Sequence, residues 1–267
     1  MSGLFTKELR SRRTSALAFC AAIFGFVVLY ISIFPTFQKQ SASFGKIFAS
    51  LPKGFSENLG VGLNTFTNVQ NFLSVELFAI IWPLIAIIVS VSTAGSSIAG
   101  EVEKGTMGTL LSLPLGRAKI FWTKYLVGVL IIAAFVTSSL IAAMPLASLL
   151  GLTYDVSAFL LTALMCAVFA LCVYSYAFLL SSVFNEKSRV YALAGGTLML
   201  MYVVNLVSSL INDLHFLRFG SVFYYFTARQ TLALGHINTA NLAILIIPVI
   251  VFSVTGYIVF NRKDIAV

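Results

Sequence analysis

Two glycines, Gly100 and Gly105, have the G-x-x-x-x-G spacing of a loop that binds nucleotide phosphates. Such a loop needs a lysine and then a serine or threonine directly after the second glycine, because these side chains reach the phosphates and the magnesium ion. Here Thr106 and Met107 follow instead, and no strand pattern precedes the first glycine. The sequence therefore argues against nucleotide binding by this loop.

The same passage has the pattern of an amphipathic helix over Glu101–Ser112, ended by Pro114. At about 100° per residue its apolar half holds Val102, Thr106, Met107, Leu110, Leu111 and Leu113. Its polar half holds Glu101, Lys104, Gly105, Gly108, Thr109 and Ser112. The two glycines lower helix propensity by roughly 1 kcal/mol each relative to alanine, which favours a surface where a protein packs closely. A solvated surface helix, or a helix lying on the membrane face, is the alternative.

Catalytic chemistry has little support in the sequence. The histidines, His215 and His236, do not lie in H-E-x-x-H, and no G-x-S-x-G occurs. The cysteines, Cys20, Cys166 and Cys172, fall in apolar runs, where cysteine behaves as a small hydrophobe. We therefore expect no metal site, no disulfide, no cofactor and no enzyme activity in this chain.

The composition predicts an all-α protein that crosses a membrane several times. Hydrophobic residues make up 59% of the 267 residues and charged residues only 10%, against roughly a quarter charged in soluble domains. Six charge-poor runs are each long enough for a helix to cross a bilayer, which takes about 20 residues. We expect one transmembrane domain over residues 1–267, with an uncleaved first span. The expected spans are residues 15–34, 77–99, 121–143, 158–183, 190–211 and 241–260.

The basic residues predict that both termini lie in the cytoplasm, because Lys and Arg are retained on that side. With this orientation, 12 of the 17 Lys and Arg residues fall inside: Lys7, Arg10, Arg12, Arg13, Lys104, Arg117, Lys119, Lys124, Lys187, Arg189, Arg262 and Lys263. The net charge of +8 is then a topology signal and requires no nucleic-acid partner. We expect a multi-pass protein of the cell (cytoplasmic) membrane, in contact with membrane lipid.

The predicted spans lack the charged side chains that a transporter driven by ions uses. Ion-coupled transporters place acidic or basic side chains within the membrane, where the ion binds. Here Glu76, Asp155 and Asp213 lie at span edges. Within the spans the polar content is Asn205 and scattered Ser, Thr and Tyr residues, which are typical of contacts between helices. Energy for transport must therefore come from outside the membrane.

Two outer segments, 35–73 and 212–240, connect spans. In the second segment, the aromatic residues can be interpreted as a gate at the outer end of the pathway. The simpler interpretation is that these residues anchor the segment in the lipid headgroup region. The gate residues would be Phe219, Phe223, Tyr224, Tyr225 and Phe226. In the second span, Pro83 predicts a kink, because proline removes one backbone hydrogen bond.

The passage IAGEVEKGTMGTLLSLPLGRAKIFWTKYL resembles the cytoplasmic segment of ABC type-2 transporter permeases. The residues that match in order are Glu101, Gly105, Thr106, Leu110, Leu111, Pro114, Arg117 and Lys124. The aromatic stretch Phe219–Phe226 and the terminal FNRKDIAV are also similar to that family. Leu115 and Gly116 depart from it, since Ile-Ser often stands there.

The resemblance implies a permease subunit that dimerises and pairs with two copies of a separate ABC ATPase subunit. Residues 100–119 would be the cytoplasmic coupling segment, with Glu101–Ser112 as the coupling helix that docks on the ATPase. ATP and magnesium would bind in that partner. The second permease would be another copy of this chain or a related one, and short re-entrant helices would form the outer segment between spans five and six. We expect a permease for export; a membrane scaffold or sensor that recruits the ATPase without transporting is the alternative.

Overall fold

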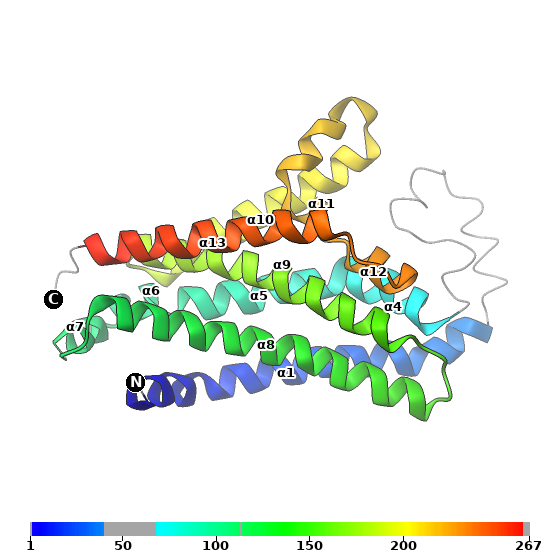
Figure 1. The fold of residues 1–267 in the computed structure, drawn as a ribbon, viewed down its shortest axis with the longest axis horizontal. Coiled ribbons are helices and arrows are strands. Elements are labelled where there is room, and N and C mark those ends of the chain that lie inside the picture. Colours follow the sequence, from blue (N-terminus) through cyan, green and yellow to red (C-terminus); the bar gives the residue numbers. More distant parts are fainter. Residues whose placement is uncertain (1, 40–67, 113, 264–267) are drawn as a thin grey trace.

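The computed structural model describes residues 2–39, 68–112 and 114–263. Throughout these ranges the chain is helical or turn, with no strand, and six helical stretches are long and apolar enough to cross a membrane (Figure 1). This confirms the predicted all-α class with six spans. The spans lie in α1 (Ser2–Lys39), α4 to α5 (Val69–Gly95), α8 (Arg117–Leu149), α9 (Val156–Val183), α10 (Lys187–Leu210) and α13 (Thr239–Arg262).

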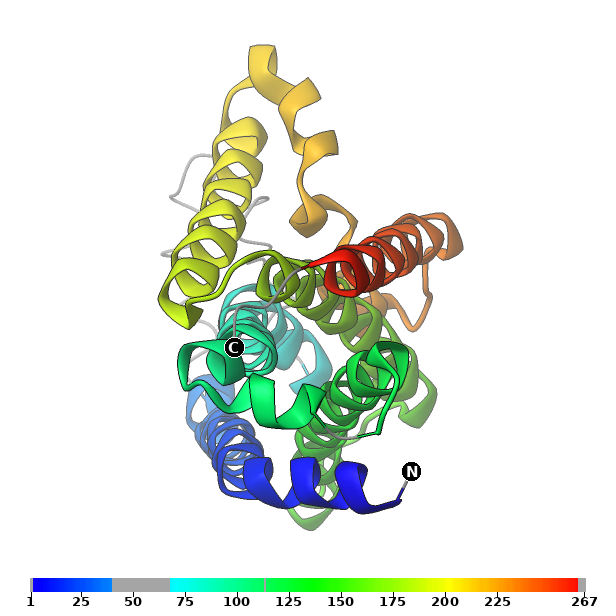
Figure 2. The same ribbon diagram turned by 90° about the vertical axis from the view of Figure 1, so that its left-hand side faces the viewer.

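Helix α9 lies at the centre of the bundle and packs against α5, α8, α12 (Ala228–Leu234) and α13. It carries no charged residue and is apolar around its whole circumference, as expected of a helix surrounded by other helices. Phe159, Phe169 and Phe178 are completely buried along its length. Helix α1 packs along α8 on the far side of the bundle (Figures 1 and 2).

The second span is interrupted by a change of helix type just before Pro83, the residue at which a kink is predicted. A short helix, α4 (Val69–Glu76), leads into a π-helical turn, Leu77–Ile81, and then into α5 (Trp82–Gly95). A proline has no N–H for the bond to the carbonyl four residues earlier, and its ring crowds that carbonyl. The wider π turn, labelled η1, accommodates this local mismatch.

Both ends of the predicted first outer segment, 35–73, are helical, and its membrane boundaries stay a prediction. Helix α1 continues through Pro35 to Lys39, and α4 already begins at Val69; residues 40–67 lie outside the described ranges. The side chain of Asn68 accepts a hydrogen bond from the backbone N–H of Asn71 and so caps α4. The ring of Phe72 packs against α1, which adds buried apolar contact that composition alone does not reveal.

The second outer segment consists of three short helices: a 3₁₀ helix, η2 (Asn212–Gly220), then α11 (Val222–Tyr225) and α12 (Ala228–Leu234). The far half of α10 and the adjoining η2 project from the bundle, and α11 and α12 lead back to it (Figure 2). Short helices were predicted here; their re-entry into a membrane stays a prediction.

Candidate coupling site

The passage that carries the coupling motif lies at the end of the bundle where the chain begins (Figure 1). It forms two short helices, α6 (Ala99–Glu103) and α7 (Thr106–Leu111). The predicted single helix Glu101–Ser112 was therefore wrong. Gly105 separates the two helices with φ of +70°, a left-handed conformation that glycine adopts without steric cost and that ends a right-handed helix.

The two short helices turn apolar side chains into the bundle. Met107 and Leu110 are buried in the core. Thr106, which the single-helix pattern placed on the apolar half, is exposed, because the break at Gly105 changes the direction in which the following residues point. Of the predicted docking residues, Gly108 is half-buried and the exposed ones are Lys104, Gly105, Thr109 and Ser112.

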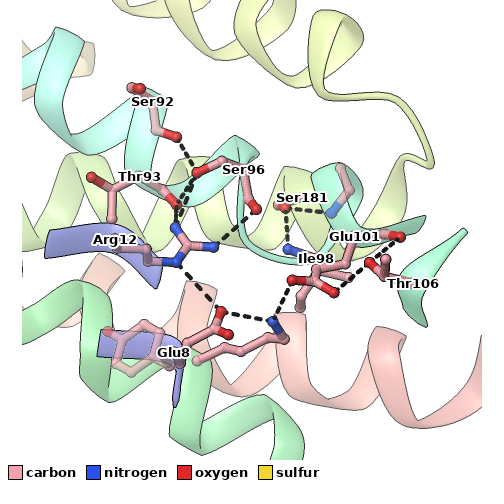
Figure 3. A network of polar contacts seen from close by, with 12 residues as sticks. Glu8, Arg12, Ser92, Thr93, Ser96, Ile98, Glu101, Thr106 and Ser181 are labelled. Atoms are coloured by element: carbon pink, nitrogen blue, oxygen red, sulfur yellow. Dashed lines mark hydrogen bonds and ion pairs between the residues drawn. The ribbon is translucent and has the colours of Figure 1, made fainter. Parts of the chain in front are cut away.

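Glu101 behaves differently from the other predicted docking residues, because its side chain is only 24% exposed and is bound within the chain. Its Oε1 lies 3.5 Å from Nζ of Lys124, and its Oε2 accepts a hydrogen bond of 2.6 Å from the hydroxyl of Thr106 (Figure 3). Burial alone raises the pKa of Glu101, but the charge of Lys124 and the Thr106 hydrogen bond outweigh it, so that the pKa lies below its usual value. The carboxylate thus joins α6 to both α7 and α8.

Lys124 is the centre of a buried ionic network. Its side chain is completely shielded from solvent, and its Nζ donates to Oε1 of Glu8 at 2.7 Å as well as facing Glu101. A buried ammonium requires such partners, because its removal from water costs several kcal/mol. Two elements distant in sequence, the N-terminal turns of α1 and the coupling segment, are therefore tied to the start of α8.

Arg12 completes this network from α1. Its Nε lies 3.4 Å from Oε1 of Glu8, and its guanidinium donates to the carbonyl oxygens of Thr93 and Ser96 at 2.9 Å each and to the Ser96 hydroxyl at 3.0 Å (Figure 3). The last carbonyls of a helix have no partner within the helix. Arg12 therefore fixes the end of α5, from which the chain enters α6.

Helices α9 and α10 hold the coupling segment from the opposite side. The hydroxyl of Ser181, in α9, accepts hydrogen bonds from the backbone N–H groups of Ile98 and Ala99 at 3.2 and 3.0 Å. The carboxylate of Glu103 accepts the backbone N–H of Lys187 at 2.9 Å, at the start of α10. A carboxylate is favourable there, because the first N–H groups of a helix are unpaired and carry partial positive charge.

Sequence reasoning missed the roles of Glu8 and Arg12. Arg12 enters the sequence analysis only as one of the basic residues that orient the chain, and Glu8 does not enter it. Their spacing of four residues, with acid before base, was a signal for a pair on one helix face. Their contacts with α5 and α8 depend on tertiary packing, which the sequence pattern does not give.

The five predicted gate residues fall into two groups. Phe226 stacks on Trp82 with ring centroids 5.8 Å apart and lies 4.3 Å from Phe169, and buried Phe223 contacts Phe169 at 5.5 Å. The other three, Phe219, Tyr224 and Tyr225, form a separate set of edge-to-face contacts between the end of η2 and the end of α11, with centroids 5.1 to 5.2 Å apart. The structure therefore brings them together as two clusters, one packed into the bundle and one beside η2.

Within the described ranges, no group of three or more His, Cys, Asp or Glu side chains is placed to hold a metal ion. Cys166 and Cys172 are buried in α9 as free cysteines.

The chain was also compared with known proteins. Residues 4–265 match the sequence profile of a family described as ABC-2 family transporter protein. No curated protein matches the chain significantly. The family match covers nearly the whole chain, six helices are able to span a membrane, and the coupling motif lies at one end of their bundle. This chain is therefore a multi-pass membrane protein that belongs to the ABC-2 transporter family, as the membrane component of a transporter.

Proposed function

We propose that this chain forms the membrane pathway of an ABC transporter and that a separate ATP-hydrolysing subunit docks on α6 and α7. The observation that carries the proposal is how these helices are held. Lys104, Thr109 and Ser112 face outward, while the neighbouring Glu101 is fixed by a buried ion pair to Lys124. An exposed surface that is rigidly joined to the spans is suited to transmitting force.

The exposed surface of α6 and α7 leaves room for a partner protein. A Cβ added at Gly105 would have nothing within 4 Å, so the backbone there is open to close approach. Lys104 beside it and Thr109 and Ser112 on α7 offer one charge and two hydroxyls. A groove on the ATPase would receive this surface, and complementary charge would set its orientation.

The buried network supports transmission from this surface to the spans. A displacement of Glu101 either carries Lys124 and α8 with it or breaks a buried ion pair. Separating the two charges would deprive the completely buried ammonium of Lys124 of one of its two carboxylate partners, so joint movement is favoured. Glu8 extends the connection to α1, and Arg12 extends it to the end of α5.

Energy from ATP in a partner fits the composition of the central helix. Helix α9 contains no Asp, Glu, Lys or Arg along Val156–Val183, so it offers no charged site for a proton or metal ion. ATP and magnesium would bind in the ATPase subunit, and this chain would need no cofactor of its own.

The working complex would hold two copies of this chain and two of the ATPase. One six-span subunit has no two-fold symmetry, whereas a pair of ATPase subunits presents two equivalent grooves. A related permease in place of the second copy is the alternative. On the family resemblance, we assign export as the direction, the cytoplasmic membrane as the location and the cytoplasm as the side of α6 and α7.

Reconstitution in lipid vesicles tests the proposal. The chain, co-expressed with its ATPase, would be supplied with panels of apolar drugs, peptides and lipids, and ATP hydrolysis would be measured. A compound that stimulates hydrolysis and crosses the vesicle membrane in an ATP-dependent manner supports the transporter. Stable ATPase binding without transport of any compound would favour the scaffold or sensor. A mass of the extracted complex that contains one copy of this chain and no second permease would contradict the dimer.

A further inference from the structure

A cavity of about 340 Å³ lies far from the coupling segment, between the π turn η1, the second half of α10 and the helices of the second outer segment. Its walls are formed by Phe78, Ala79, Ile80, Tyr202, Asn205, Leu206, Ser209, Arg218, Phe223, Tyr224, Phe226, Thr227, Arg229 and Gln230. This volume is at the lower end of the usual range for small-molecule sites, roughly 300–1,000 Å³. The cavity is therefore large enough for a ligand group and not only for a water molecule.

Among the described residues that line the cavity, the charged ones are both basic. Arg218 and Arg229 contribute two cations, and no Asp or Glu lies among the described residues that form the walls. Burial lowers the pKa of Arg229, since a charged group is disfavoured away from water. The electrostatics of the cavity therefore favour an anionic ligand.

Two hydrogen-bonding atoms at the cavity have no partner among the described residues. The Nε of Arg218 and the Oγ1 of Thr227 are buried from solvent and unsatisfied. A buried donor without an acceptor is unfavourable, and native structures contain few of them. Both groups can donate to a ligand oxygen, and a carboxylate or phosphate offers several such acceptors.

The guanidinium of Arg218 is held in place by aromatic rings. Its Cζ lies 4.9 Å from the ring centroid of Tyr224 and 5.3 Å from that of Phe219. Cation–π contacts of this kind restrict the side chain, so less freedom is lost when an anion binds. The cation is thus oriented before any ligand arrives.

Part of the remaining wall is apolar and belongs to the membrane-spanning helices, while Asn205, Ser209 and Gln230 add uncharged polar groups. Phe78 and Ile80 come from the second span and Leu206 from α10. Such side chains suit hydrocarbon and disfavour a fully hydrated ion. We propose that this cavity binds an amphipathic anion, with its carboxylate or phosphate at Arg218 and Thr227 and its apolar part along these side chains. The inference goes beyond the proposed function, since binding requires neither ATP nor a partner.

Native mass spectrometry of the full-length chain in an uncharged detergent tests this inference. The probes are dioleoyl phosphatidylglycerol, its zwitterionic phosphatidylcholine counterpart, dodecyl phosphate and inorganic phosphate. We expect phosphatidylglycerol to bind at least about tenfold more tightly than phosphatidylcholine or inorganic phosphate. Binding of phosphatidylglycerol alone supports the inference with a membrane lipid as the ligand. Comparable binding of dodecyl phosphate supports it with a soluble amphiphile.

Variants locate the bound anion. Arg218→Gln should weaken phosphatidylglycerol binding about tenfold, and Thr227→Val, which keeps the side-chain volume, should weaken it severalfold. Arg262→Gln, the same charge change in the last turn of α13, should leave it unchanged. Arg218→Lys keeps the charge but lacks Nε and should be intermediate; this variant separates loss of the ligand contact from general misfolding. Equal binding of the two lipids, or equal loss in Arg218→Gln and Arg262→Gln, would overturn the inference, as would inorganic phosphate binding as tightly as phosphatidylglycerol.

Discussion

The ammonium of Lys124 lies 3.5 Å from Oε1 of Glu101, so the start of one membrane span is ionically bonded to the segment predicted to contact the ATPase. Nζ of the same lysine lies 2.7 Å from Oε1 of Glu8 on α1. Three elements that are distant in the sequence thus share one buried cation. The stability of this junction and the coupling of the transporter should therefore depend on the same side chains.

Lys124→Met should destabilise the folded protein strongly, because it leaves Glu8 and Glu101 without their buried cation. Breaking a buried pair in this way costs roughly 3–5 kcal/mol. For a chain of this size we expect the apparent unfolding temperature in detergent to fall on the order of 10 °C. Lys7→Met, which removes the same charge at an exposed position of α1, is the control and should change it little. Equal shifts in the two variants would contradict a structural role for the network.

Acid should weaken the junction through Glu101. Because its folded-state pKa is below the ordinary value of 4.5, its contribution to stability is present above that value and is lost as the pH falls through the folded-state pKa. The unfolding temperature should therefore decline more steeply below about pH 4.5 in the native protein than in Glu101→Gln. Unfolding scans between about pH 6 and pH 3 measure this difference. Parallel curves for the two proteins would show that Glu101 titrates normally.

Gly105 should tolerate asparagine better than alanine. Its φ of +70° is left-handed, and an L side chain there costs roughly 1–2 kcal/mol unless it is asparagine or aspartate. Nothing lies within 4 Å of an added Cβ, so steric overlap plays no part. We expect Gly105→Ala to lower the unfolding temperature and Gly105→Asn to retain most of it. If alanine is neutral, the break between α6 and α7 does not depend on this glycine.

The break at Gly105 shows where sequence reasoning reached its limit. The six spans follow from long charge-poor runs, because hydrocarbon excludes charged side chains whatever the tertiary packing. The direction of α7 depends instead on one backbone angle, and a glycine inside a helical pattern is compatible with either a helix or a break. The start of α4 at Val69 was missed for a similar reason, since burial of Phe72 against α1 outweighs the polar composition of the run.

The docking role of the candidate site stays a prediction, but the structure shows which of its side chains are exposed. The motif residues were found from spacing and from the family resemblance, and Lys104, Thr109 and Ser112 are exposed as a docking surface requires. Glu101 was assigned to that surface, but its side chain turns to Lys124. A helical wheel cannot register this, because the attraction comes from a residue on another helix.

The orientation of the bundle can be tested by thiol labelling in intact cells, using a background in which the native cysteines are replaced. His236→Cys, in the exposed turn before α13, should react with a membrane-impermeant reagent. Arg262→Cys, at the opposite end of α13, should react only after the membrane is permeabilised. Labelling of Arg262→Cys from outside would reverse the assigned topology.

Co-purification of the ATPase with single-site variants tests the central claim, that α6 and α7 dock the ATP-hydrolysing subunit. Thr109→Trp places a bulky side chain on the exposed face of α7 and should remove most of the bound ATPase while the chain still reaches the membrane. Thr239→Trp makes the same change at an exposed position at the start of α13 and should retain the ATPase fully. If Thr109→Trp carries as much ATPase as Thr239→Trp and the native chain, α6 and α7 are not the docking surface.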